Sequence, residues 1–232
     1  MERELEQISR AYEDVVTGID AEAKATEGRA YGGIVRAGKG KLVESIAKTL
    51  VELAWQGLGR DPARLTFPRK KVAIPLRKPY LERIHVPEVR NYILNNISQH
   101  IYPLKTDLHV HIEERFCMGI ECKAYTENAM LKRILVDFTL LKTQSADLDC
   151  VLVQLESQLT GDYSQLKGVR MGSPSTHTLL SYFDVDLHII TLLEGERKVE
   201  QPIHEAEHYK PLTIDSLSQA VEVFQSLLAK HT

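Results

Sequence analysis

The sequence predicts an α/β fold in which a central mixed β-sheet is flanked by helices. Two runs with alternating apolar residues, 106–113 and 116–125, are joined by a short charged turn and predict a β-hairpin. An amphipathic helix is expected next, over 127–142. Two further apolar runs, 150–155 and 185–193, have the length and composition of buried strands. This order of elements predicts a layered domain.

Helices are expected before the hairpin. Residues 2–27 place apolar side chains at helical spacing. The glycine-rich, basic stretch 28–41 predicts a flexible loop, and a second helix should run from Leu42 to the glycines at 57 and 59. Gly38–Lys41 has the form GxGK, but Leu42 occupies the Ser/Thr place of a nucleotide-binding loop. Contact between this loop and phosphates is therefore expected rather than a nucleotide site.

The remaining segments are punctuated by prolines, basic residues and small polar residues. Residues 61–105 carry six prolines between short extended pieces, with one short helix expected over 87–101, where Pro87 starts it. Residues 166–183 predict a surface loop. The chain should close with an amphipathic helix over 215–230, capped by Asp215 or Ser216.

Composition fits a globular protein, since 43% of residues are hydrophobic and 26% are charged. No run of about 18 apolar residues predicts a membrane helix, and the charged N-terminus lacks a signal-peptide core, so a cytoplasmic location is expected. The net charge of −3 gives no global sign of nucleic-acid binding, but a local basic cleft would suffice. The three cysteines match no zinc or redox motif.

The predicted hairpin carries three side chains that can do chemistry. Glu121 and Lys123 are two residues apart on one strand and should share a face. Pairing of the two strands would bring Asp107 to the same face. Two carboxylates suit Mg²⁺, which prefers oxygen ligands, and the backbone carbonyl of Cys122 is a further candidate ligand. Lys123 can hold the attacking water or stabilise developing negative charge.

Asp107, followed by Glu121-x-Lys123 on a second strand and then a helix, resembles the PD-(D/E)xK nuclease core. The segment GIECKAYTENAMLKRI is similar to the matching strand and helix of type II restriction endonucleases. Thr106 stands where the motif has proline. The resemblance implies that Asp107 and Glu121 bind Mg²⁺ and that Lys123 assists the water. Glu44, on the preceding helix, would supplement the site.

The resemblance covers a core of about 41–155 and implies one nuclease domain over 1–232 with a restriction-endonuclease-like fold. It also implies sequence-specific hydrolysis of double-stranded DNA, a homodimer that presents one site to each strand, and a possible partner DNA methyltransferase. The first and last helices are the expected dimer surface, and the C-terminal additions are expected to read DNA. The residues expected to contact DNA are Lys39, Lys41, Arg69, Lys70, Lys71, Arg170, Ser173, Ser175, Thr176 and His177.

Three other functions stay open at this point. A structure-specific or repair nuclease could use the same core, and a non-catalytic DNA-binding module could retain the fold. His109 and His111 lie in a D-L-H-V-H-I string that resembles the first metal-binding strand of metal-dependent amidohydrolases. Only 125 residues follow Asp107, however, too few for a barrel of about 250 residues that begins there.

Overall fold

A central five-stranded sheet organises the chain, whose computed structural model describes residues 1–24, 29–160 and 172–232. The strand order is β1-β4-β5-β6-β7. The strands are β1 Leu65–Thr66, β4 Leu108–Ile112, β5 Arg115–Thr126, β6 Asp149–Ser157 and β7 Leu187–Thr191. Pairing is antiparallel from β1 to β5 and parallel from β5 to β7. The predicted mixed sheet is therefore confirmed.

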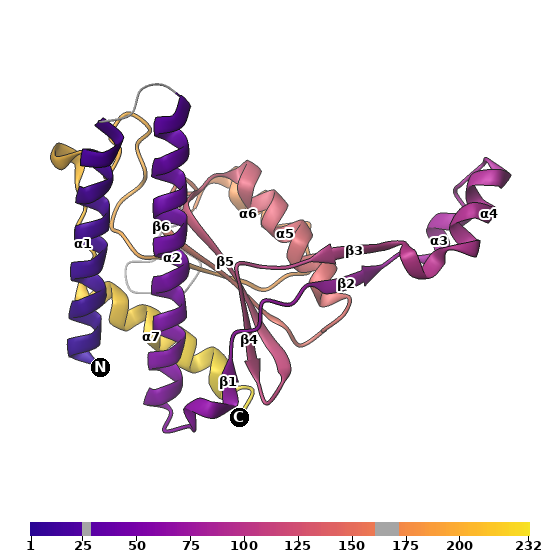
Figure 1. Ribbon diagram of the computed structural model, residues 1–232, viewed down its shortest axis with the longest axis horizontal. Helices are drawn as coiled ribbons and strands as arrows, with labels where there is room; N and C mark the ends of the chain where they lie inside the picture. The colour runs from indigo at the N-terminus through magenta and orange to yellow at the C-terminus, as the bar shows by residue number, and fades with distance from the viewer. Residues whose placement is uncertain (25–28, 161–171) are drawn as a thin grey trace.

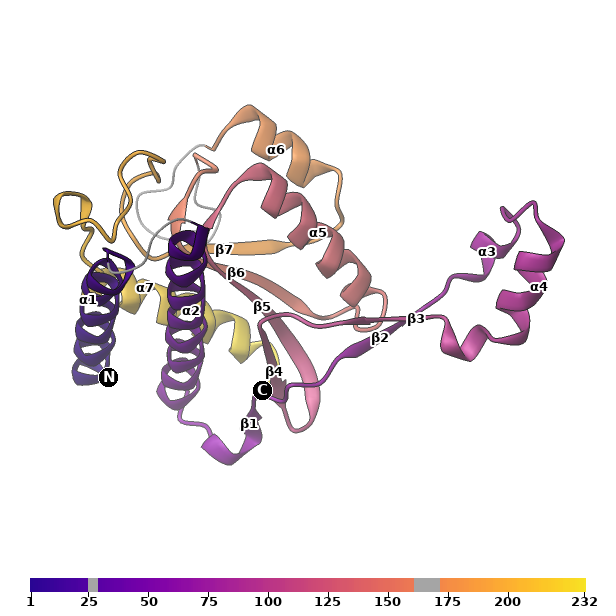
Figure 2. The same cartoon turned by 45° about the horizontal axis from the view of Figure 1, so that its top comes forward.

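Helices cover both faces of this sheet, as predicted (Figures 1 and 2). One layer contains α1 Glu2–Lys24, α2 Arg29–Gly57 and α7 Ile214–Ala229, and the other contains α5 Asn128–Lys142 and α6 Pro174–Ser181. The sheet supplies alternate side chains to two separate cores because its strand side chains alternate between the faces. Among the described residues, no helix is long and apolar enough to cross a membrane.

β5 shows how this alternation builds the interior. Met118, Ile120 and Cys122 belong to the core beneath α2. Gly119 faces the other way, and a Cβ placed there would lie 3.1 Å from the Phe138 ring of α5. The ring therefore packs directly on the backbone of β5, and this close approach explains the glycine.

Two segments expected as loops contain helix among their described residues. The glycine-rich stretch after residue 28 forms the first turns of α2, so the flexible-loop prediction is wrong. From Leu42 onward, α2 is firmly packed in the core. The helix continues from there towards its N-terminus because each residue added to it gains a backbone hydrogen bond, which offsets the cost of glycine. Within 166–183, α6 begins after Ser173, whose side chain accepts a hydrogen bond from the Thr176 amide and caps it.

Residues 69–105, termed the arm below, form a projection from the body (Figures 1 and 2). Its stem is a two-stranded ribbon of β2 Val72–Pro75 and β3 Ile101–Leu104. The far end carries α3 Lys78–Leu81 and α4 Pro87–Asn95, followed by a 3₁₀ turn at Ile97–Gln99. The predicted helix start at Pro87 is confirmed, although the helix ends at Asn95 rather than near residue 101. Two more 3₁₀ turns lie outside the arm, at Pro62–Arg64 and Ala206–His208.

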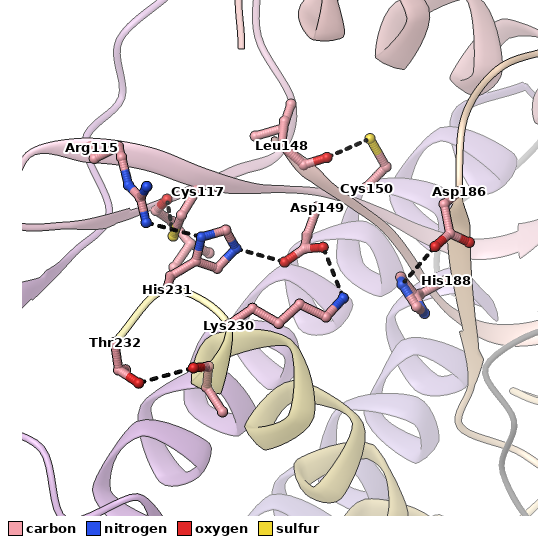
Figure 3. A network of polar contacts seen from close by, with 12 residues as sticks. Arg115, Cys117, Leu148, Asp149, Cys150, Asp186, His188, Lys230, His231 and Thr232 are labelled. Atoms are coloured by element: carbon pink, nitrogen blue, oxygen red, sulfur yellow. Dashed lines mark hydrogen bonds and ion pairs between the residues drawn. The ribbon is translucent and has the colours of Figure 1, made fainter. Parts of the chain in front are cut away.

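The C-terminal helix is fastened to the sheet by a polar network centred on Asp149, at the start of β6 (Figure 3). The Oδ2 atom of Asp149 lies 2.7 Å from His231 Nε2, and its Oδ1 atom lies 3.3 Å from Lys230 Nζ. Arg115 Nη2 lies 3.1 Å from His231 Nδ1. Because arginine can only donate, the imidazole accepts at Nδ1 and donates to Asp149 through Nε2.

Candidate active site

The β4–β5 hairpin places the two predicted carboxylates opposite each other. Glu113 and Glu114 form its tight turn, with φ angles of 49° and 68°. Leu108 pairs with Ile120, so one further step of the same antiparallel register sets Asp107 opposite Glu121. The structure thus brings together two residues that lie 14 positions apart in the sequence.

Three oxygen atoms converge on the ammonium group of Lys123. Its Nζ atom donates to Glu121 Oε2 at 2.6 Å, to Asp107 Oδ2 at 2.9 Å and to the carbonyl oxygen of Cys122 at 3.2 Å. The backbone N–H of Cys122 donates to Asp107 Oδ2 at 2.7 Å and fixes that carboxylate. These are the same oxygen donors that the sequence suggested for a metal, and here they surround one cation.

Burial sets the electrostatics of this cluster. Desolvation raises the pKa of Glu121, and the nearby charge of Asp107 raises it further, while the Lys123 ammonium opposes both effects. Burial lowers the pKa of Lys123, but the charges of Glu121 and Asp107 outweigh that effect and raise it. Two carboxylates share one ammonium, so the cluster has capacity for a second positive charge.

The donor set fits a hard divalent cation. Mg²⁺ takes oxygen ligands, is commonly held by one or two carboxylates and keeps several waters. Asp107, Glu121 and the Cys122 carbonyl supply such oxygens from the protein, and waters and a phosphate oxygen would complete the set. No group of three His, Cys, Asp or Glu side chains suited to a metal occurs in the described ranges, so the main-chain carbonyl is needed to complete the protein's share.

A cleft of about 570 Å³ opens beside Asp107. Glu44 of α2 and Asp107 both line this cleft. Five cations contributed by α2 and the root of the arm line the same cleft. These cations are Lys41, Lys48, Arg69, Lys70 and Lys105. The cleft is suited to hold a polyanion against the carboxylate cluster.

His109 also lines the cleft, but its Nε2 atom and one face of its ring are already engaged. The Thr106 amide donates to His109 Nε2 at 3.1 Å, and the ring stacks on Phe116 with centroids 4.4 Å apart. Burial, together with His111 and Lys105, lowers the pKa of His109 to about 4. A neutral imidazole whose Nε2 lone pair already accepts a hydrogen bond is a poor zinc ligand, so the amidohydrolase interpretation has no support here.

The residues predicted to contact DNA have different outcomes. Lys41, Arg69 and Lys70 line the cleft, and Lys71 is exposed beside it. The prediction for Lys39 is wrong: the side chain is buried, with Nζ 3.3 Å from His204 Nδ1. Its loop proved to be a helix, and that helix turns the side chain into the protein interior.

The polar segment near α6 is only partly available for DNA. Ser173 caps α6, and Thr176 is buried and donates to Asn128 Oδ1 at 2.8 Å, so both hydroxyls serve the fold. Ser175 and His177 are exposed. Arg170 lies outside the described residues.

Sequence reasoning missed Lys48 and Lys105, which line the cleft. A signal for Lys48 was present, because Lys41, Glu44 and Lys48 are spaced by three and four residues and so share one helix face. Lys105 immediately precedes the Thr106-Asp107 pair, and nothing in its local pattern distinguishes it from other lysines of the proline-rich stretch.

The chain resembles a known protein along nearly its whole length. The chain is 46% identical over 234 residues to the Type II restriction enzyme DdeI of Desulfomicrobium norvegicum. That match covers 99% of this chain and 98% of the relative. No family model matches the sequence.

Proposed function

The chain belongs to the family of type II restriction enzymes, and on that premise we propose that Asp107, Glu121 and Lys123 form its catalytic centre. The activity is sequence-specific cleavage of double-stranded DNA, by hydrolysis of phosphodiester bonds. The observation that carries the proposal is the convergence of three oxygen donors on the Lys123 ammonium. That arrangement supports a cation site at the edge of a basic cleft.

Mg²⁺ is the metal that we assign to the site. Enzymes of this family generally need a divalent metal, and the all-oxygen donor set favours Mg²⁺ over softer ions. Asp107, Glu121 and the carbonyl of Cys122 would hold it, and Glu44 would supplement them from across the cleft. When bound, the metal would polarise the scissile phosphate and lower the pKa of a bound water.

Lys123 has the main part in directing the nucleophile. Its ammonium lies among the same oxygens that would hold the metal, so it must move from that point when the site is filled. Its Nζ would then donate to the attacking water or to the phosphate oxygens as their negative charge grows. The raised pKa of Glu121 means that protons compete with the metal for its carboxylate, and cleavage should therefore rise with pH through that pKa.

The cleft cations would hold the DNA backbone. Lys41, Lys48, Arg69, Lys70 and Lys105 contribute five positive charges to the wall beside Asp107. Contacts to phosphates fix the register of the duplex but carry no base sequence. Ser175 and His177, exposed on α6, remain our proposed readers of base edges, together with Arg170.

We further propose one nuclease domain that acts as a cytoplasmic homodimer, with a DNA methyltransferase to protect host sites. Two copies would supply one catalytic centre for each DNA strand. The apolar stripes of α1 and α7 are already buried within the chain, with Leu5, Tyr12 and Phe224 almost fully covered. The expectation that these stripes form the dimer surface therefore loses its basis.

Two substitutions test the catalytic assignment. Glu121→Gln keeps the shape but removes the charge that holds the metal, and Lys123→Ala removes the ammonium. Both variants should lose plasmid cleavage in Mg²⁺ and still bind the duplex in a gel-shift assay. Lys132→Ala, an exposed change on α5, is the matched control and should cut normally. Cleavage at the wild-type rate by either site variant would refute the assignment.

A further inference from the structure

The arm concentrates positive charge. Its residues, 69–105, include eight Lys or Arg but only two Glu, which gives a formal charge of +6. The whole chain carries −3, so the remainder carries −9. The 37 residues of the arm therefore carry a net charge opposite in sign to that of the rest of the protein. Such an asymmetry indicates a polyanionic partner.

These eight cations are exposed, and no carboxylate of the described ranges pairs with them. All eight side chains are exposed to solvent, and no ion pair joins any of them to the part of the chain that the structure describes. By contrast, Arg64, just before the arm, is paired with Glu113 at 2.6 Å. The arm thus keeps its charges available for a partner.

The arm begins and ends at the catalytic cleft. Arg69, Lys70 and Lys105 at its root line that cleft, and Lys105 precedes Asp107 by two residues. From this root the ribbon runs four residues on each strand, which spans about 13 Å at roughly 3.3 Å per residue. That length matches about four base pairs of B-DNA, with α3 and α4 beyond it. A duplex held in the cleft would meet the arm outside the cut site.

We propose that the arm is a second DNA-binding surface, which clamps the duplex beside the cleavage site through Arg77, Lys78, Arg83 and Arg90. The proposal rests on duplex DNA as the substrate of the enzyme. These four cations lie beyond the cleft, on the segments around α3 and α4. Tyr80 and Tyr92, which are 51% and 64% exposed at the same end, can pack on sugars or bond to phosphates.

The same end of the arm also exposes apolar side chains, including Val86, Val89 and Leu94. This feature alone would also suit a contact with a second copy of the chain. DNA is the better partner because a protein interface would have to desolvate the unpaired cations, whereas phosphates would pair with them. The test below separates the two partners.

A charge-deleted arm provides the test. The variant replaces Arg77, Lys78, Arg83 and Arg90 by Ala, and a control replaces the exposed body residues Arg3, Arg10, Lys132 and Lys198 by Ala. Binding of labelled duplexes of about 40 and about 10 base pairs is followed by fluorescence anisotropy at several salt concentrations. EDTA prevents cleavage, and thermal melting checks that both variants fold.

On the long duplex, the arm variant should bind more weakly, and its slope of log K against log salt should fall by about 3 to 4, roughly 0.9 per lost phosphate contact. On the short duplex, which extends only about five base pairs to either side of the cut, the slope should fall by less than on the long one, and the control should match the wild type on both. An unchanged slope on the long duplex, or an equal loss in the control, would overturn the proposal. The proposal would also be overturned if the arm variant kept the wild-type slope and sedimented with a lower mass than the wild type. That result would show that the arm contacts a second subunit.

The proposed catalytic centre and the proposed DNA-binding arm can be refuted independently. Asp107→Ala, run in the same binding assay, should keep the wild-type salt slope because the measurement needs neither metal nor cleavage. A normal slope change for the arm variant would stand even if Asp107→Ala still cut DNA.

Discussion

Replacing Lys39 by Met should stabilise the protein, although the sequence suggested that this lysine binds DNA. Lys39 is only 8% exposed and lies beside His204 and Arg197, with Glu156 as its nearby opposite charge. Burial lowers the pKa of Lys39 from 10.5 to about 8. A charged amine at neutral pH therefore costs folding free energy, and methionine fills a similar volume without charge.

The size of the effect follows from that pKa. Each pKa unit corresponds to 1.36 kcal/mol, so the buried charge costs about 3 kcal/mol at pH 7. Loss of the hydrogen bond to His204 offsets about 1 kcal/mol. The variant should gain about 2 kcal/mol at pH 7, which raises the melting temperature by about 4–8 °C for a domain of this size.

The pH dependence provides the sharper check. The lowered pKa means that the unfolded chain binds more protons than the folded one between pH 8 and 10.5, so wild-type stability recovers as pH rises through that window. The gain of Lys39→Met should thus be constant below pH 8 and nearly vanish by about pH 9.5. Thermal melts of both proteins at pH 7, 8 and 9.5 measure it, with DNA affinity unchanged. This account of Lys39 would be refuted if the variant were less stable than the wild type at pH 7, or if its gain in stability did not change with pH.

Three other substitutions have defined outcomes. Glu121→Gln should stabilise the metal-free protein at neutral pH, because burial raises the pKa of Glu121. Denaturant titration should show this gain in stability fading as pH falls towards 4.5. A gain that persists below pH 4.5 would show that the buried charge of Glu121 is not its cause. Glu44→Ala should slow plasmid cleavage by about 10- to 100-fold without weakening duplex binding, and normal cleavage would remove Glu44 from the site. Phe138→Ala should cost about 3–5 kcal/mol in the free energy of unfolding, because the ring is fully buried against Gly119; a loss below about 1 kcal/mol in chemical denaturation would show that this packing is misjudged.

The hairpin could be predicted from sequence because its signals are local. Alternation with period two placed Glu121 and Lys123 on one face, and the two glutamates at 113 and 114 marked the turn. The turn alone would set Asp107 opposite Ile120, and a β-bulge between Val110 and His111, which no local pattern announces, shifts the pairing by one residue so that Asp107 lies opposite Glu121. The resemblance to a nuclease core then supplied roles that spacing alone could not.

The errors arose where tertiary contacts decide the outcome. Glycines around residue 38 predicted a loop, but the strongly buried helix that follows continues through them. Ser173 and Thr176 were typical of an exposed polar loop, yet their hydroxyls cap and anchor α6. The arm gave no periodic signal because prolines interrupt it, so its projection from the body could be found only from the structure.

The most direct test of the central claim is digestion of plasmid and phage DNA by the wild type and by Asp107→Ala, each with Mg²⁺ and with EDTA. Asp107 joins the carboxylate cluster to the basic cleft, so its loss should remove one of the two carboxylates proposed to bind the metal, while the cleft cations remain. Discrete bands from the wild type that need Mg²⁺ and vanish in Asp107→Ala would match the prediction. Equal cutting by the variant, or cutting that survives EDTA, would contradict a metal site built on Asp107.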